Sequence, residues 1–93
     1  MSMAEDQERL PQLLTELRSQ LAASTSIDDG TRRRLEATIA DIERLLGGPA
    51  PKSARAESLA GRLGDTAVDF EASHPTLAVT ISGIIDALGN LGI

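Results

Sequence analysis

His74 is the residue best suited to acid–base chemistry, because it is the only histidine in a chain without cysteine. In a Ser-His-Asp arrangement it would act as the base, with Ser73, Asp69 or Asp86 as nominal partners. Ser73 and His74 are sequence neighbours just before a proline, and no glycine-framed nucleophile turn accompanies them. We therefore interpret His74 as a helix-boundary residue and expect no enzymatic activity.

A metal site would require several histidine, cysteine or carboxylate side chains to converge. Glu71 and His74 lie three residues apart and could share a helix face, but two ligands are too few for a site. The glycines lack the Gly-x-x-x-x-Gly-Lys spacing of a phosphate-binding loop. The sequence therefore predicts no cofactor and no metal, with an enzyme or metal site around His74 as the alternative left open.

Arg32, Arg33 and Arg34 form the one basic run of the chain. Acidic residues flank it on both sides, and three consecutive helical residues point in three directions. We interpret the run as solvated surface. The net charge of −5 and the lack of stacking aromatic residues also argue against a nucleic-acid partner.

Two stretches of the amino-terminal half show the three-to-four-residue apolar spacing of amphipathic helices. The first predicts a helix over about 9–23, with Pro11 in its first turn. The second predicts a helix over about 27–46, with a cap hydroxyl from Ser26 and a stop at Gly47. We expect the two helices to form an antiparallel hairpin.

Residues 47–53 are rich in glycine and proline and predict a linker. Beyond it, apolar spacing predicts helical segments over about 54–73 and 75–89. The aliphatic composition, with a single Phe and no Tyr or Trp, favours helix packing over a sheet. The predicted fold is all-α, with one domain over 1–93.

The apolar stripes on either side of Pro75 are in phase. Leu77 follows Leu59 by 18 positions, which is about five helical turns. This phase favours one long carboxy-terminal helix kinked near His74. Pro75 also permits two separate helices, because it lacks an N–H and disfavours helical geometry at His74.

From Pro75 onward the chain carries one charge, Asp86. A chain of 93 residues has a small core, so we expect a second copy to cover this apolar segment in a dimeric helical bundle. Its polar residues argue against a transmembrane segment. The predicted interaction residues are Leu77, Ile81, Ile84, Ile85, Leu88 and His74.

The absence of cysteine fits a reducing compartment. Residues 1–6 are acidic, whereas a secretory signal begins with positive charge followed by an apolar stretch. We therefore expect a cytoplasmic protein.

Two carboxy-terminal segments, FEASHPTL over 70–77 and IIDALGNLGI over 84–93, carry a family resemblance. They resemble a family of short bacterial proteins known as domain of unknown function 4404. The resemblance implies no activity, cofactor or catalytic residue. It does imply that Ser73-His74-Pro75 and the ending over 90–93 form a recurring unit that meets a partner.

The leading functional prediction is a non-catalytic protein–protein interaction module that self-associates as a homodimer through its apolar carboxy-terminal helix. The alternative is an adaptor or regulator that docks a larger partner, at a membrane-associated complex, through the same helix.

Overall fold

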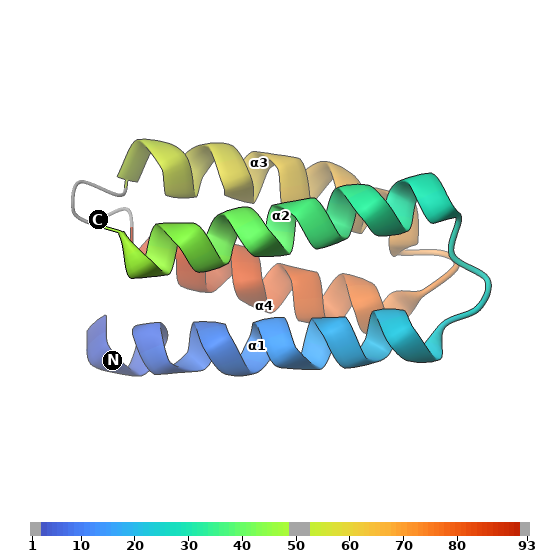
Figure 1. Ribbon diagram of the computed structural model, residues 1–93, viewed down its shortest axis with the longest axis horizontal. Helices are drawn as coiled ribbons and strands as arrows, with labels where there is room; N and C mark the ends of the chain where they lie inside the picture. Colours follow the sequence, from blue (N-terminus) through green and yellow to red (C-terminus); the bar gives the residue numbers. More distant parts are fainter. Residues whose placement is uncertain (1–2, 49–52, 92–93) are drawn as a thin grey trace.

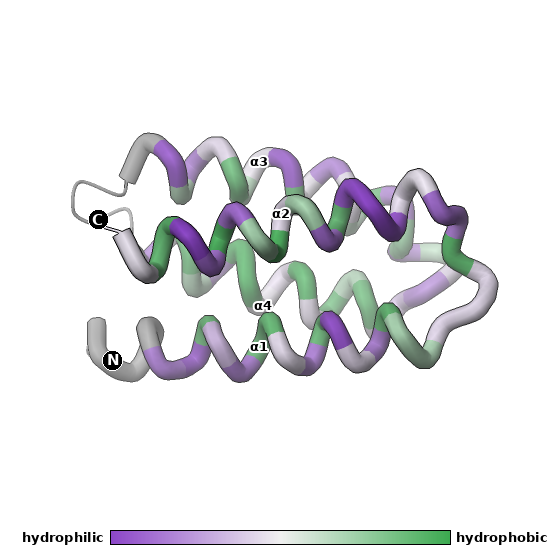
Figure 2. Tube along the Cα trace, in the orientation of Figure 1, coloured by the Kyte–Doolittle hydropathy of each residue, from purple (hydrophilic) through white to green (hydrophobic). Residues whose placement is uncertain are grey.

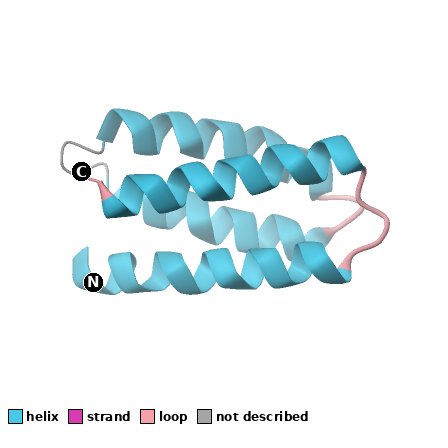
Figure 3. Ribbon diagram, in the orientation of Figure 1, coloured by secondary structure: helices cyan, strands magenta, loops and turns pink. Residues whose placement is uncertain are grey.

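Four α-helices and the turns between them make up the described part of the chain (Figure 1), with no strand among these residues (Figure 3). The computed structural model describes residues 3–48 and 53–91, and the side chains of 8–48 and 55–90. The predicted all-α class is confirmed. The helices are α1 (Met3–Ala23), α2 (Asp29–Gly47), α3 (Ser53–Phe70) and α4 (Pro75–Leu91).

The helices lie side by side as an up-down-up-down bundle of 37 × 23 × 19 Å (Figure 1). Each helix contacts two others: α4 lies against α1 and α3, and α2 contacts the same two. The contact between α3 and α4 is the most extensive, and that between α1 and α2 is the smallest. A single chain therefore supplies all four helices of this bundle.

α1 begins at Met3, about six residues before the expected start, so Pro11 lies inside the helix instead of in its first turn. The residues ahead of Pro11 include alanine and several acidic residues, which suit the amino-terminal end of a helix. The Thr15 hydroxyl donates to the Pro11 carbonyl at 2.9 Å. A proline therefore does not mark the start of this helix.

α2 begins after Asp28, which caps the helix in place of the predicted Ser26. The Asp28 carboxylate accepts a hydrogen bond from the backbone N–H of Thr31 at 3.2 Å. At the other end, the N–H of Gly48 donates to the Leu45 carbonyl at 3.2 Å. Local hydrogen bonds thus define both ends of α2.

The predicted linker over 47–53 is described only at its two ends. Gly47 is the last residue of α2, and Ser53 is the first residue of α3. Residues 49–52 lie outside the described residues.

The chain reverses between α3 and α4, so the prediction of one long helix kinked near His74 is wrong (Figure 1). Pro75 has no N–H to donate to the Glu71 carbonyl and disfavours helical geometry at His74, which favours a break at this point. The His74 N–H donates to the Phe70 carbonyl at 2.7 Å. The His74 carbonyl then accepts from the Ala78 N–H at 3.1 Å, which starts α4.

The in-phase stripes of α3 and α4 are equally compatible with an antiparallel pair. Phase determines which side of each helix is apolar, but it does not determine the direction of the chain after a break. Leu63 of α3 and Ile81 and Ile84 of α4 are all fully buried. The stripes therefore bury each other within one chain.

The core consists of aliphatic side chains from all four helices, with Phe70 as its only aromatic residue. Apolar residues recur about once per turn along the helices, and α4 carries little hydrophilic character (Figure 2). The largest fully buried side chains are Leu10, Leu17, Leu21, Leu35, Ile39, Ile42, Leu63, Ile81, Ile84 and Leu88.

Candidate functional site

The apolar residues predicted to form a dimer seam lie on the inner side of α4. Four of them, Leu77, Ile81, Ile84 and Leu88, are at most 4% exposed within the single chain. Ile85 is partly buried against the same core. The argument that this stripe needs a second copy to cover it is therefore wrong, because α1 and α3 already cover it. A surface for self-association has to lie elsewhere.

The outer side of α4 exposes small and mostly uncharged residues. Val79 is 73% exposed and Val68, on the adjacent helix α3, is 67% exposed; they are the only exposed large hydrophobic residues in the described part of the chain. A Cβ atom built on Gly89 would meet nothing within 4 Å, so this position faces open space. We call the following residues the valine surface: Val68, Val79, Ser82, Asp86 and Gly89.

The outer sides of α1 and α2 differ sharply from the valine surface, because they carry many charges. Their exposed charged residues in the described side chains are Glu8, Arg9, Glu16, Arg18, Asp29, Arg33, Arg34, Glu36, Glu43 and Arg44. The charge of the molecule is thus concentrated away from α4.

His74 lies where the α3–α4 turn meets the α1–α2 turn, at one end of the bundle (Figure 1). Its Nε2 lies 3.3 Å from the Ser26 hydroxyl oxygen, at hydrogen-bonding distance. Its ring also packs edge-on against Phe70, with 5.5 Å between the ring centroids and an interplanar angle of 83°. His74 therefore connects two turns that are 48 residues apart in sequence.

Within the described part of the chain, His74 forms no hydrogen bond with any of the side chains predicted as its partners. These predicted partners were Ser73, Asp69, Asp86 and Glu71. Its hydrogen-bonding partner, Ser26, was missed, because only the packing of two distant turns brings the two side chains together. A serine and a histidine are two members of a nucleophilic triad, but no carboxylate among the described residues orients this ring. Nor do three His, Cys, Asp or Glu side chains of the described residues gather there to hold a metal.

The arginine run does not form a single patch. The Arg32 guanidinium donates to the carbonyls of Leu21 and Ser24, at the carboxyl end of α1. The Leu21 carbonyl also accepts from the Ser24 N–H at 3.3 Å. Arg32 adds a side-chain donor to this end of the helix and so caps α1. Arg33 and Arg34 are exposed. The sequence interpretation as solvated surface missed this capping role of Arg32.

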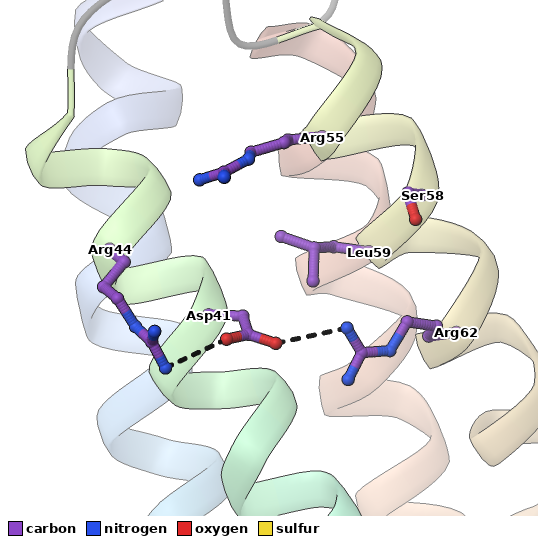
Figure 4. Close-up of a pocket in the computed structure, with 6 residues that line it drawn as sticks. All are labelled: Asp41, Arg44, Arg55, Ser58, Leu59 and Arg62. Atoms are coloured by element: carbon purple, nitrogen blue, oxygen red, sulfur yellow. Dashed lines mark hydrogen bonds and ion pairs between the residues drawn. The ribbon is translucent and has the colours of Figure 1, made fainter.

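A second group of arginines lines a hollow of about 280 Å³ between α2 and α3 (Figure 4). Asp41 of α2 accepts from Arg44 at 3.1 Å and from Arg62 of α3 at 3.2 Å. The sequence does not single out these residues, since they are scattered singly along two separate helices. We call this site the arginine hollow; it is lined by Asp41, Arg44, Arg55, Ser58, Leu59 and Arg62.

A family model described as Domain of unknown function (DUF4404) matches residues 10–93, which includes both carboxy-terminal segments that carry the resemblance. No curated protein and no solved structure matches the chain. None of the described helices combines the length and the apolar character needed to cross a bilayer.

Proposed function

The chain belongs to the DUF4404 family of domains of unknown function, and we propose that it is a non-catalytic protein–protein interaction module that self-associates as a homodimer. One observation carries the proposal. The outer side of α4 exposes Val79 and carries a single charge, Asp86, whereas the outer sides of α1 and α2 are densely charged. Val68 adds a second exposed valine on α3, where Asp65 and Asp69 are also exposed. An exposed surface of low charge on a small protein favours contact with another protein.

A second copy of the same chain is the occupant that fits this surface best. In a two-fold dimer the same patch meets itself, so both partners contribute apolar and small residues, and the charged sides of α1 and α2 stay in solvent. α4 has 17 residues and is therefore about 26 Å long. With α3 beside it, the two helices present a face about 20 Å wide, or about 500 Å² per partner, which corresponds to a small interface of about 1,000 Å² in total.

We propose a non-catalytic role because the Ser26–His74 pair has no orienting carboxylate among the described residues. Its position between two turns supports a structural role for His74. We propose the bacterial cytoplasm as the location, since the chain contains no cysteine and resembles short bacterial proteins.

Sedimentation velocity tests the proposed homodimer. Wild-type protein should sediment as a dimer at high micromolar concentration, and the double variant Val68→Lys/Val79→Lys should sediment as a monomer. Two lysines facing two lysines across a two-fold axis repel each other and must be desolvated. The matched control Ala22→Lys/Ala37→Lys adds the same charge at exposed positions of α1 and α2 and should remain dimeric.

A wild-type chain that stays monomeric over this range contradicts the homodimer, and docking of a different protein becomes the better explanation of the valine surface. If the control also becomes monomeric, net charge and not the valine surface controls association.

A further inference from the structure

The arginine hollow brings together side chains that lie on matching faces of two helices. Arg55, Ser58 and Arg62 are separated by three, four and seven residues, so they share one side of α3. Asp41 and Arg44 are three residues apart on α2. Arg55, Leu59 and Arg62 extend from α3 toward α2, across the same gap (Figure 4).

The hollow carries more positive than negative charge. Three arginines against one aspartate leave two positive charges in excess, in a chain whose net charge is −5. The carboxylate of Asp41 pairs with two of the three arginines, Oδ1 with Arg44 and Oδ2 with Arg62. Arg55 is the arginine of the hollow that Asp41 does not pair with among the described residues.

Arg55 has no hydrogen bond or ion pair with any residue in the described part of the chain. Arg62, by contrast, also donates to the Thr38 hydroxyl at 3.2 Å, so it has a structural role between α2 and α3. An ion-pair network that only holds the two helices together would explain Arg44 and Arg62. It does not explain why Arg55 extends into the same hollow.

We propose that the arginine hollow binds the phosphate group of a small phosphate monoester. A guanidinium offers a planar set of N–H donors that matches phosphate oxygens and is weakly hydrated. A phosphate monoester carries a charge of about −1.5 to −2 near neutral pH, which matches the two excess positive charges. Ser58 adds a hydroxyl donor, and Leu59 supplies an apolar wall for the organic part of the ligand.

This site is independent of the proposed homodimer. The hollow lies between α2 and α3, whereas the valine surface lies on the outer side of α4 and on Val68. The failure of either proposal therefore leaves the other unchanged.

Titration of the full chain with inorganic phosphate, followed by amide chemical shifts at constant ionic strength, tests the proposal. The shifts should saturate and should concentrate at the amides of Arg44, Arg55 and Ser58. Glycerol 3-phosphate should produce the same pattern and glycerol should produce none, which separates phosphate recognition from binding of the organic part. A free-phosphate site without room for an ester would bind inorganic phosphate alone, and would overturn the monoester proposal.

Three variants make the test specific. Arg55→Ala should raise the dissociation constant about tenfold, since a charge-assisted hydrogen-bonding partner is lost. The matched control Arg33→Ala removes an exposed arginine of α2 outside the hollow and should change it less than about twofold. Asp41→Asn should lower the dissociation constant several-fold, because it frees Arg44 and Arg62 for the ligand.

Arg55 makes no bond with the described residues, so Arg55→Ala should fold like the wild type, which the amide spectrum itself reports. Shifts that do not saturate, or equal effects of Arg55→Ala and Arg33→Ala, would show general attraction to positive charge and would overturn the proposed site.

Discussion

Asp28 anchors the start of α2 through a single side-chain hydrogen bond to the backbone N–H of Thr31. Replacing Asp28 with alanine leaves that N–H without its acceptor and removes a negative charge from the positive end of the helix dipole. The free energy of unfolding should fall by about 1 kcal/mol. Urea unfolding followed by circular dichroism measures this change.

Asp29→Ala is the matched control for Asp28. Asp29 is exposed in the first turn of α2 and accepts no capping hydrogen bond, so its loss should cost less than about 0.5 kcal/mol. Equal losses in the two variants would mean that the charge near the dipole, and not the cap, stabilises the start of α2.

The sequence predicted a cap at this turn but assigned it to the wrong residue. Ser26 and Asp28 are both good capping residues, and apolar spacing alone does not choose between them. The choice is explained by Ile27, which is only 7% exposed and packs into the core. With Ile27 directed inward, Ser26 reaches His74 and Asp28 reaches the free N–H of Thr31. Tertiary packing therefore assigns the roles of neighbouring polar residues.

Of the four helices, α4 shows the clearest contrast between a buried side and an exposed side. Ile84 is fully buried, so Ile84→Ala should lower the free energy of unfolding by about 2–5 kcal/mol through lost burial and a cavity. Val79 is 73% exposed, so Val79→Ala should change it by less than about 0.5 kcal/mol. Urea unfolding at low protein concentration, where the monomer dominates, measures both values.

The opposite ranking of these two variants would mean that α4 turns its other side to the core. Comparable large losses in both would indicate that Val79 is also covered in the unit that unfolds, as in a dimer that persists on dilution.

The helices could be predicted from the sequence because each has an apolar stripe with helical spacing. Residues of these stripes, such as Leu17, Ile39 and Leu63, do lie in the core of the bundle. The arrangement of the helices in space could not be predicted in this way. The direction of the chain after Pro75 depends on which arrangement buries more of both stripes, and spacing along one helix carries no such information. The arginine hollow was missed for a related reason, because it depends on how residues of α2 and α3 align across the bundle.

At the scale of the whole molecule, one chain already encloses the apolar stripe of α4, so we expect the monomer to fold without a partner. The charged sides of α1 and α2, the arginine hollow and the valine surface lie on different parts of the bundle. An interaction module with this layout can associate through α4 while the hollow stays open to a small ligand.

The proposed dimer should therefore be one of folded monomers, and its stability should depend on protein concentration. Above the dissociation constant, each tenfold rise in concentration adds about 1.4 kcal/mol per dimer, or about 0.7 kcal/mol per chain. For a chain of this size, the Tm of the wild type should rise by about 3–6 °C per tenfold increase. The double variant Val68→Lys/Val79→Lys should melt cooperatively at a Tm that does not vary with protein concentration. Thermal circular dichroism over two decades of concentration measures both Tm values.

The core of the single chain is complete, so the double variant should stay folded at room temperature. If it is unfolded there, this view is contradicted and the fold depends on its partner.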